Sequence, residues 1–443
     1  MSEPASASDG PFERSLGLVH VTTSGVALII GAGVFVLLAP ATQRAGGLVW
    51  ASFVVAAVLC TLSAFSYMEL SSMFPKAGSE HEFARQVFPE SVSFVVGWAM
   101  ALALIVATAT VSLGFARYLG EFVDIDERLG ALAILALVSA VALRGMGEAS
   151  RVIMGFAVVE VGGLIAVIVI GASSIGDHSL LEGNGASGVM SGAALIFFAY
   201  IGFDEVISLS EETRNPRRTV PRALILALGI STLLYTGVAI AGVSVLGADE
   251  LGRSTRPMTE IFAVGFGGAS SDVVTVVALF STASTVLLAI TASSRIMYGM
   301  ASTGYLPASL GRVHRQVVPR NALGIAIVLG ALLILIEDLD LLASATDALI
   351  YVLFLVTNVV VIVLRKQRPN VERPFRVRGS IGWVPIVPIL AMLVTILLSF
   401  QLDGDAVLLA LGLLAGGFVA RQLGGRWFTP MHGHPLDHSG RKG

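Results

Sequence analysis

The sequence contains few charged residues and one cysteine. Only 13% of its 443 residues are charged and 55% are hydrophobic, whereas soluble domains carry about 25% charged residues. So little charge cannot cover a water-facing surface, which excludes a soluble enzyme, a disordered regulator and a nucleic-acid binder. The lone Cys60 excludes an intrachain disulfide framework and a cysteine metal cluster. No Gly-x-x-x-x-Gly-Lys-Ser/Thr motif occurs, so the chain does not hydrolyse ATP itself.

Long apolar stretches dominate the sequence instead. A helix that crosses the hydrocarbon core of a bilayer needs about 20 mostly apolar residues, and the ~10-residue alternation of a membrane β-barrel is absent. The first stretch is too long for the hydrophobic region of a signal peptide. The sequence therefore predicts an all-α integral membrane protein with twelve transmembrane helices. They are expected at 17–41, 48–73, 91–119, 129–145, 152–174, 188–210, 221–246, 271–298, 321–337, 341–364, 384–401 and 404–422.

The charges between these stretches predict the orientation. With the N-terminus in the cytoplasm, most of the 28 lysines and arginines fall in cytoplasmic segments. The exceptions are Arg44, Arg117, Arg128, Arg253 and Arg256. Because cytoplasmic loops of membrane proteins carry an excess of basic residues, we expect a multi-pass protein of the cytoplasmic membrane with both termini in the cytoplasm.

Two predicted helices are interrupted at corresponding positions. The first contains Gly31-Ala32-Gly33, and the sixth contains polar residues and a glycine over 200–205. These helices are five apart and run in opposite directions, which is typical of an inverted repeat with a binding site at the membrane midplane. We expect a membrane domain at 17–422, with cytoplasmic tails at 1–16 and 423–443. Within the membrane domain, the two repeats are expected at 17–174 and 188–364, followed by two further helices at 384–422.

A broken helix leaves peptide groups free to bind a ligand. The N–H groups that begin one half attract a carboxylate, and the carbonyls that end the other half attract an ammonium group or a metal cation. An α-amino acid carries both charges. Free backbone groups at this depth are tolerated only where they line a cavity. The alternative is that Gly31 and Gly33 merely allow close packing of helices.

Ordered motifs over residues 17–380 resemble the amino acid–polyamine–organocation superfamily. The segment 197–204 (FFAYIGFD), followed by 211–216 (EETRNP), resembles the sixth helix of its amino acid permeases, nearest the cationic amino acid transporter branch. The segment 31–35 (GAGVF) resembles the break in the first helix. Further matches are Tyr67-Met68-Glu69-Leu70, Pro75-Lys76-Ala77-Gly78-Ser79, Gly97-Trp98, Ser294-Arg295, Gly304-Tyr305-Leu306-Pro307, Leu364-Arg365, Pro369 and Arg373-Pro374-Phe375.

The resemblance implies a fold of the leucine-transporter type, with two inverted five-helix repeats, broken helices 1 and 6, and two additional helices. It implies secondary active transport by alternating access. Amides near Gly31, Ala32 and Gly33 would hold the substrate carboxylate, and carbonyls near Tyr200, Ile201 and Gly202 would hold its amino group. The substrate-binding residues that we predict are Ile30, Gly31, Ala32, Gly33, Phe198, Tyr200, Ile201, Gly202, Phe203 and Asp204.

Helix 5 departs from the pattern of the superfamily. Some proton-coupled relatives have a lysine where this chain has Glu160. An ionisable group in the middle of a span costs about 2.5–3.5 kcal/mol on insertion scales and is a functional candidate. Glu160 could cycle protons, could bind Na⁺ together with hydroxyls of helix 8, or could form a static ion pair or hydrogen bond. The ion-coupling residues that we predict are Glu160, Ser281, Ser284 and Thr285.

The sequence thus predicts a secondary transporter that moves amino acids or related amines by proton symport. The coupling ion is H⁺ or Na⁺, the surroundings are a lipid bilayer, and no cofactor, resident metal or nucleic acid is expected. An exchanger without ion coupling and a non-transporting amino acid sensor are the alternatives. Asp347 of helix 10 could touch the substrate or could be a packed, protonated acid, and Glu69 of helix 2 is expected to be structural or part of an inner gate.

Overall fold

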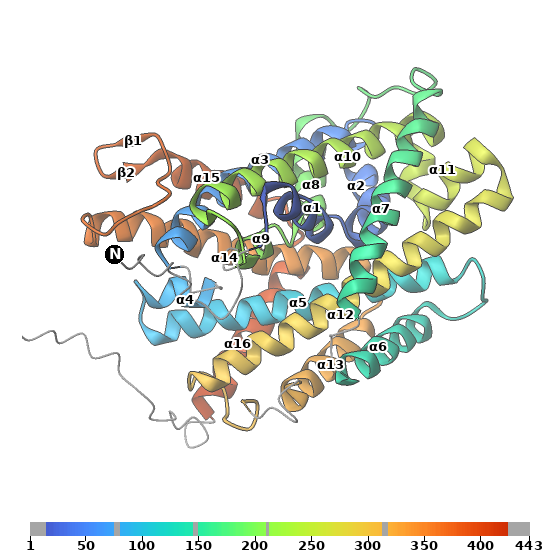
Figure 1. The fold of residues 1–443 in the computed structure, drawn as a ribbon. Helices are drawn as coiled ribbons and strands as arrows, with labels where there is room; N and C mark the ends of the chain where they lie inside the picture. The colour runs from blue at the N-terminus through green and yellow to red at the C-terminus, as the bar shows by residue number, and fades with distance from the viewer. Residues whose placement is uncertain (1–14, 75–79, 145–148, 210–211, 312–317, 424–443) are drawn as a thin grey trace, which may run out of the picture.

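The computed structural model describes residues 15–74, 80–144, 149–209, 212–311 and 318–423, so the predicted tails lie almost wholly outside the described residues. The chain is a bundle of helices with one two-stranded hairpin (Figure 1). The elements are α1 (Leu18–Ile29), α2 (Ala32–Ala45), α3 (Val49–Met73), α4 (Glu80–Arg85), α5 (Glu90–Leu119), α6 (Glu127–Arg144), α7 (Ala149–Ala172), α8 (Gly185–Ile196), the 3₁₀ helix η1 (Phe197–Tyr200), α9 (Glu205–Ser208), α10 (Pro216–Arg253), α11 (Pro257–Phe266), α12 (Gly268–Ser302), α13 (Arg320–Ile334), α14 (Leu339–Gln367), β1 (Ser380–Ile381), β2 (Val384–Pro385), α15 (Ile386–Ser399) and α16 (Gly404–Leu423).

The predicted apolar stretches coincide with helices. Each of the twelve contains one helix or an interrupted pair. Within the described residues, seven helices are long and apolar enough to cross a membrane, or eight if the bent pair α1 and α2 counts as one span. Helices α13 and α15 are apolar but shorter. The helical membrane fold is therefore confirmed, while the count of twelve crossings and the repeat arrangement stay predictions.

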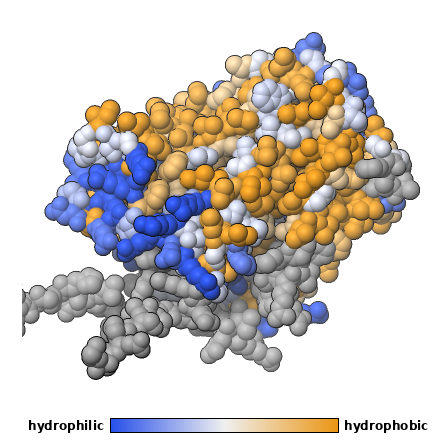
Figure 2. All heavy atoms as spheres, turned by 45° about the horizontal axis from the view of Figure 1, so that its top comes forward, coloured by the Kyte–Doolittle hydropathy of each residue, from blue (hydrophilic) through white to orange (hydrophobic). Residues whose placement is uncertain are grey.

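The outer surface has the polarity of a membrane protein. Large apolar side chains such as Leu233 and Val158 are about three-quarters exposed. Figure 2 shows an apolar surface across the middle of one face, with hydrophilic residues gathered toward its two ends. So large an exposed apolar surface would be a liability in water, and it fits contact with lipid acyl chains.

Helix α5 forms the centre of the bundle. It runs beside α12 (Figure 1), and it also packs against α14 and α6. Most of its residues from Val96 to Ala116 are buried, and many of them are alanine, glycine, serine or threonine. Small residues let helix backbones approach closely where lipid offers no hydrophobic driving force for association. This rigid centre supports the interrupted helices.

Some elements were not predicted from the sequence. Helix α10 extends beyond the expected 221–246 and is kinked at Gly247, whose φ of 76° is rarely accessible to other residues. The short helix α4 follows α3, and β1 and β2 form an antiparallel hairpin in which Ser380 pairs with Pro385. Helix α4, β1 and the ends of α10 lie outside the long apolar stretches, where hydropathy carries no signal, whereas β2 occupies the first two residues of the predicted stretch 384–401.

Candidate functional site

The first helix is broken at the predicted position. Helix α1 ends at Ile29 and α2 begins at Ala32, and the two are bent by 49°. Between them, Ile30 and Gly31 adopt extended backbone conformations. The Ala32 N–H donates a hydrogen bond of 3.1 Å to Thr285 Oγ1 of α12. The start of α2 therefore presents backbone N–H groups inside the bundle, and a hydroxyl group satisfies one of them.

The sixth helix is also interrupted where the sequence predicts it. Helix α8 tightens into η1 at Phe197, the chain then turns at 201–204, and α9 supplies a single further turn. Gly202 has a φ of 108°, which explains the need for glycine at this position. The Ile201 N–H donates to Phe198 O at 3.2 Å. Backbone groups at membrane depth are thus removed from the regular α-helical pattern.

The two breaks are in direct contact. A Cβ atom added to Gly33 would lie 2.5 Å from Ala199 Cα, and one added to Gly202 would lie 2.6 Å from Leu28 O. The Tyr235 hydroxyl of α10 lies 2.8 Å from Ile29 O and 3.1 Å from Ala199 O, so it joins both breaks. In this structure the glycines therefore allow the two chain segments to pack closely at these two points.

The predicted substrate-binding residues come together at these breaks. Ile30, Ala32, Phe198, Tyr200 and Phe203 are all buried. Gly31, Ile201, Gly202 and Asp204 are partly exposed, and Gly33 is buried. The geometry unites residues about 170 positions apart in sequence, while the inverted repeat itself stays a prediction.

Aromatic contacts fix two of these side chains. The Tyr200 hydroxyl donates to Phe53 O at 3.1 Å, and its ring lies 5.4 Å from that of Tyr235. The Phe203 ring packs edge-on against Tyr67 and Phe354, with centroids 5.7 and 5.6 Å apart. Edge-to-face pairs of this kind favour a single arrangement of the rings. These aromatic groups close the site from the side of α3 and α14.

The predicted ion-coupling residues lie on α7 and α12, beside the first break. Glu160 is 4% exposed and lies next to the fully buried Ser281. Thr285 Oγ1 accepts from Ala32 N–H and donates to Ser281 O at 2.9 Å. Ser284 Oγ donates to the same carbonyl at 2.9 Å. Thr285 thus connects this group to the break, whereas the Ser284 hydroxyl bonds within its own helix.

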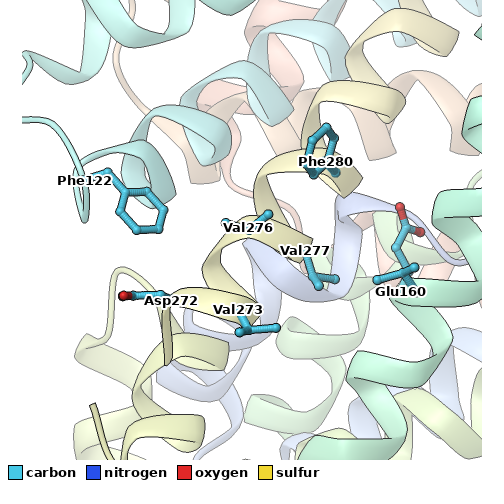
Figure 3. Close-up of a pocket in the computed structure, with 8 residues that line it drawn as sticks. Phe122, Glu160, Asp272, Val273, Val276, Val277 and Phe280 are labelled. Carbon is cyan, nitrogen blue, oxygen red and sulfur yellow. The ribbon is translucent and has the colours of Figure 1, made fainter. Parts of the chain in front are cut away.

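A groove of about 420 Å³ opens along α7 and α12 (Figure 3). Its wall is apolar apart from Glu160 and Asp272, and several of its side chains, including Val273 and Phe280, are well exposed. It is lined by Phe122, Val159, Glu160, Asp272, Val273, Val276, Val277 and Phe280. Gly33 and Gly202 are not among these residues, so the groove is distinct from the predicted substrate site.

Two further features near the breaks did not emerge from the sequence. One is Tyr235, whose hydroxyl joins the breaks. The other is Glu80 of α4, which is 5% exposed and accepts a hydrogen bond of 2.9 Å from Tyr67. Burial, and then the charge of Asp204, raises the pKa of Glu80 to about 8. A tyrosine in an apolar helix and a glutamate in a loop are common, so neither gave a distinctive signal.

Comparisons with known proteins identify the family. A family model described as "Amino acid permease" matches residues 16–413. The chain is 29% identical over 422 residues to the branched-chain amino acid permease BcaP of Bacillus subtilis (strain 168), covering 90% of each chain. It is 28% identical to the methylthioribose transporter of the same strain, covering 88% of this chain and 89% of that one. It is 29% identical to the vacuolar cationic amino acid transporter 4 of Arabidopsis thaliana, covering 82% of this chain and 65% of that one.

Proposed function

The chain belongs to the amino acid permease family, and from this premise we propose that it carries amino acids or related amines across the cytoplasmic membrane by proton-coupled symport. Its relatives are named permeases and transporters, so the chain is a transporter and not an enzyme. The observation that carries the proposal is the meeting of two broken helices inside the bundle, at Ile30–Gly31 and at 201–204.

The proposed substrate site uses the two kinds of helix end. The N–H groups that begin α2, near Ala32 and Gly33, bind the substrate carboxylate. The carbonyls near Tyr200, Ile201 and Gly202 bind its amino group. The helix dipole favours each charge at the end where we place it. Because the breaks touch one another in this structure, substrate entry requires α1 and α2 to move away from the segment 199–202.

Alternating access then follows from the proposed architecture. Repeats at 17–174 and 188–364, with both termini in the cytoplasm, place the breaks of helices 1 and 6 in opposite orientations. Rocking of one part of the bundle against the other opens the site to each side in turn. The Tyr235 hydroxyl supports this arrangement because it contacts both breaks and can transmit movement of one to the other.

We assign proton coupling to Glu160. Its carboxyl group is almost fully buried, lies beside Ser281 and is linked through Thr285 to the start of α2. A buried carboxylate without a cationic partner is costly, so the uncharged acid is the form that such a place tolerates. In an ionised state, the same carboxylate together with the Ser281 and Thr285 hydroxyls offers oxygen ligands that suit Na⁺, so a sodium gradient is the necessary comparison.

Uptake into proteoliposomes tests the function. The full chain is reconstituted and offered radiolabelled L-amino acids one at a time, including branched-chain and basic ones, with methylthioribose as a further compound because relatives carry those names. A pH gradient and a Na⁺ gradient are imposed separately. We expect accumulation of at least one amino acid that follows the pH gradient. Uptake that depends only on preloaded substrate indicates an exchanger, and binding without uptake indicates a sensor.

Glu160→Gln tests the coupling role. The amide keeps the shape of the side chain but cannot release a proton, so we expect pH-driven accumulation to fall by at least tenfold while exchange of labelled for unlabelled substrate continues. Glu372→Gln is the control, since Glu372 is 78% exposed and pairs only loosely with Arg217, at 3.5 Å. An unchanged pH dependence in Glu160→Gln would remove Glu160 from coupling.

A further inference from the structure

A second acid lies at the other break. Asp347 of α14 is 0% exposed, and neither of its carboxyl oxygens makes a well-aligned hydrogen bond among the described residues, although the Phe198 backbone lies beside the carboxyl group. Such a group is rare inside a membrane protein, because an ionised carboxylate without donors carries its full desolvation cost. The feature therefore calls for an explanation that ordinary packing does not give.

The surroundings of Asp347 place it against the break of helix 6. Its carboxyl group lies near the Phe198 backbone of η1. One turn further along α14, the Tyr351 hydroxyl donates to Ala194 O of α8 at 3.2 Å, and its ring lies 5.0 Å from that of Phe197. Helix α14 is thus fastened to the segment where α8 turns into η1, and any movement of that segment changes the environment of the acid.

The titratable and charged groups that face Asp347 are few. They are the Cys60 thiol of α3, the Tyr351 hydroxyl of α14 and, at longer range, Arg44 near the end of α2. Neither the thiol nor the phenol supplies a positive charge. Arg44 makes its ion pair with Asp403 at 2.8 Å instead. The described residues therefore provide no close cation that could hold Asp347 ionised in this state.

The arrangement repeats the one around Glu160. There, the acid of helix 5 (α7) lies near Tyr235 of helix 7 (α10), which contacts the break of helix 1. Here, the acid of helix 10 (α14) lies near Cys60 of helix 2 (α3) and faces the break of helix 6. Helices 5 and 10, 7 and 2, and 1 and 6 are the pairs that an inverted five-helix repeat exchanges.

We propose that Asp347 is a second proton-carrying acid, which serves the break of helix 6 as Glu160 serves the break of helix 1. This inference rests on the proposed proton symport. A proton can be carried by a side chain that is 0% exposed. The acid takes its proton from water when the site opens to the outside. When the site opens to the cytoplasm, the O–H bond of the acid breaks, the proton passes to water, and the carboxylate stays behind until it is protonated again.

Reconstituted vesicles test this role, with a mixture of the twenty tritiated L-amino acids as the probe. We expect Asp347→Asn to reduce both pH-driven accumulation and substrate-induced proton entry at least tenfold. The rate of exchange should stay within about twofold of the wild-type rate. Asp347→Glu, which retains an acid, should recover a substantial part of the accumulation. Asp340→Asn is the matched control, because Asp340 lies on the same helix in its first turn and should behave as the wild type.

The outcomes separate the two proposals. If wild-type vesicles take up no amino acid from the mixture, the proposed function fails and this inference fails with it. If the wild type accumulates amino acids and Asp347→Asn does so equally well, Asp347 is only a packed acid and the inference alone is overturned. A loss of exchange together with accumulation overturns it as well, since Asp347 would then be needed for substrate binding or for the fold.

Discussion

The ion pair between Glu69 and Arg365 provides a sharp test of the structure. Glu69 lies near the end of the buried part of α3, and Arg365 lies in the last turn of α14. The Arg365 Nε donates to Glu69 Oε1 at 2.9 Å, and its Nη2 donates to Glu69 Oε2. The Val377 N–H also donates to Glu69 Oε2 at 2.9 Å. The side chains are only 1% and 3% exposed, so this pair fastens α3, α14 and the following loop together.

The expected magnitude follows from burial and from the number of donors. Removing one partner leaves an uncompensated charge, which costs about 3–5 kcal/mol in buried pairs. Glu69→Gln should therefore lower the melting temperature of the detergent-solubilised protein by several degrees, because an amide cannot accept from both Arg365 nitrogens and from Val377. Arg365→Gln should lower it less, because Arg373 Nε also lies 3.4 Å from Glu69 Oε1 and continues to balance its charge. The free energy of unfolding of the double variant should fall by less than the sum of the two single losses. The difference should be about 0.5–3 kcal/mol, because the residues contact each other directly.

Thermal unfolding of the single and double variants measures this coupling. The exposed pair of Arg217 and Glu372, whose side chains are 66% and 78% exposed, is the matched control, and its disruption should have no measurable effect. Additive losses from Glu69→Gln and Arg365→Gln would refute the direct contact. A melting temperature unchanged in both single variants would refute the burial on which the magnitude depends.

Two other predictions concern helix α4 and the helix breaks. Because the folded-state pKa of Glu80 is raised to about 8 from 4.5, its stabilising contribution is fully present below pH ~4.5 and is lost as the pH rises through ~8. Glu80→Gln should therefore flatten the decline of thermal stability between pH 5 and pH 9, and an equal decline in both proteins would contradict the assignment. Gly33→Ala places a Cβ against Ala199 and should cost about 1–3 kcal/mol of stability, as overpacking does, and slow uptake. Gly229→Ala, which has open space, should be neutral, and equal effects of the two changes would show that helices 1 and 6 do not touch.

The positions of the helices could be predicted because hydropathy reports directly on lipid contact. Each predicted stretch contains a helix, and the break of helix 1 falls at Gly31, where the sequence places it. The break of helix 6 was also expected, but its form was not. The 3₁₀ helix η1 begins at Phe197, so the regular α-helix ends before the chain reaches Gly202. The sequence pattern shows that a helix is interrupted, but it does not show which groups form hydrogen bonds with the peptide groups at the interruption.

The contacts at the site could not be predicted, because they depend on side chains far apart in sequence. Thr285 is predicted as an ion ligand, which stays a prediction, and the structure adds that its hydroxyl accepts a hydrogen bond from Ala32 N–H at the break. The Tyr235 hydroxyl reaches Ile29 O, 206 positions away. Asp347 was noted in the sequence as an acid within a span, but only the structure shows that both of its oxygens lack a well-aligned hydrogen bond and that it faces Phe198. Hydropathy identifies an acid whose burial is costly, whereas the packing around it shows which segment it faces.

The proposed coupling requires that the two breaks do not open independently, because independent opening would let protons cross without substrate. The structure contains a physical reason for joint movement. Ile29 and Ala199 both present carbonyls to the single Tyr235 hydroxyl, and Gly33 lies against the Ala199 backbone. The break that moves away from Tyr235 loses the hydroxyl donor beside its carbonyl, and an unpaired buried acceptor costs about 1–3 kcal/mol. In the proposed mechanism, a zwitterion that binds both segments replaces the lost contacts. The substrate then lowers the cost of opening, and the proposed proton carriers Glu160 and Asp347 become accessible only when it is bound.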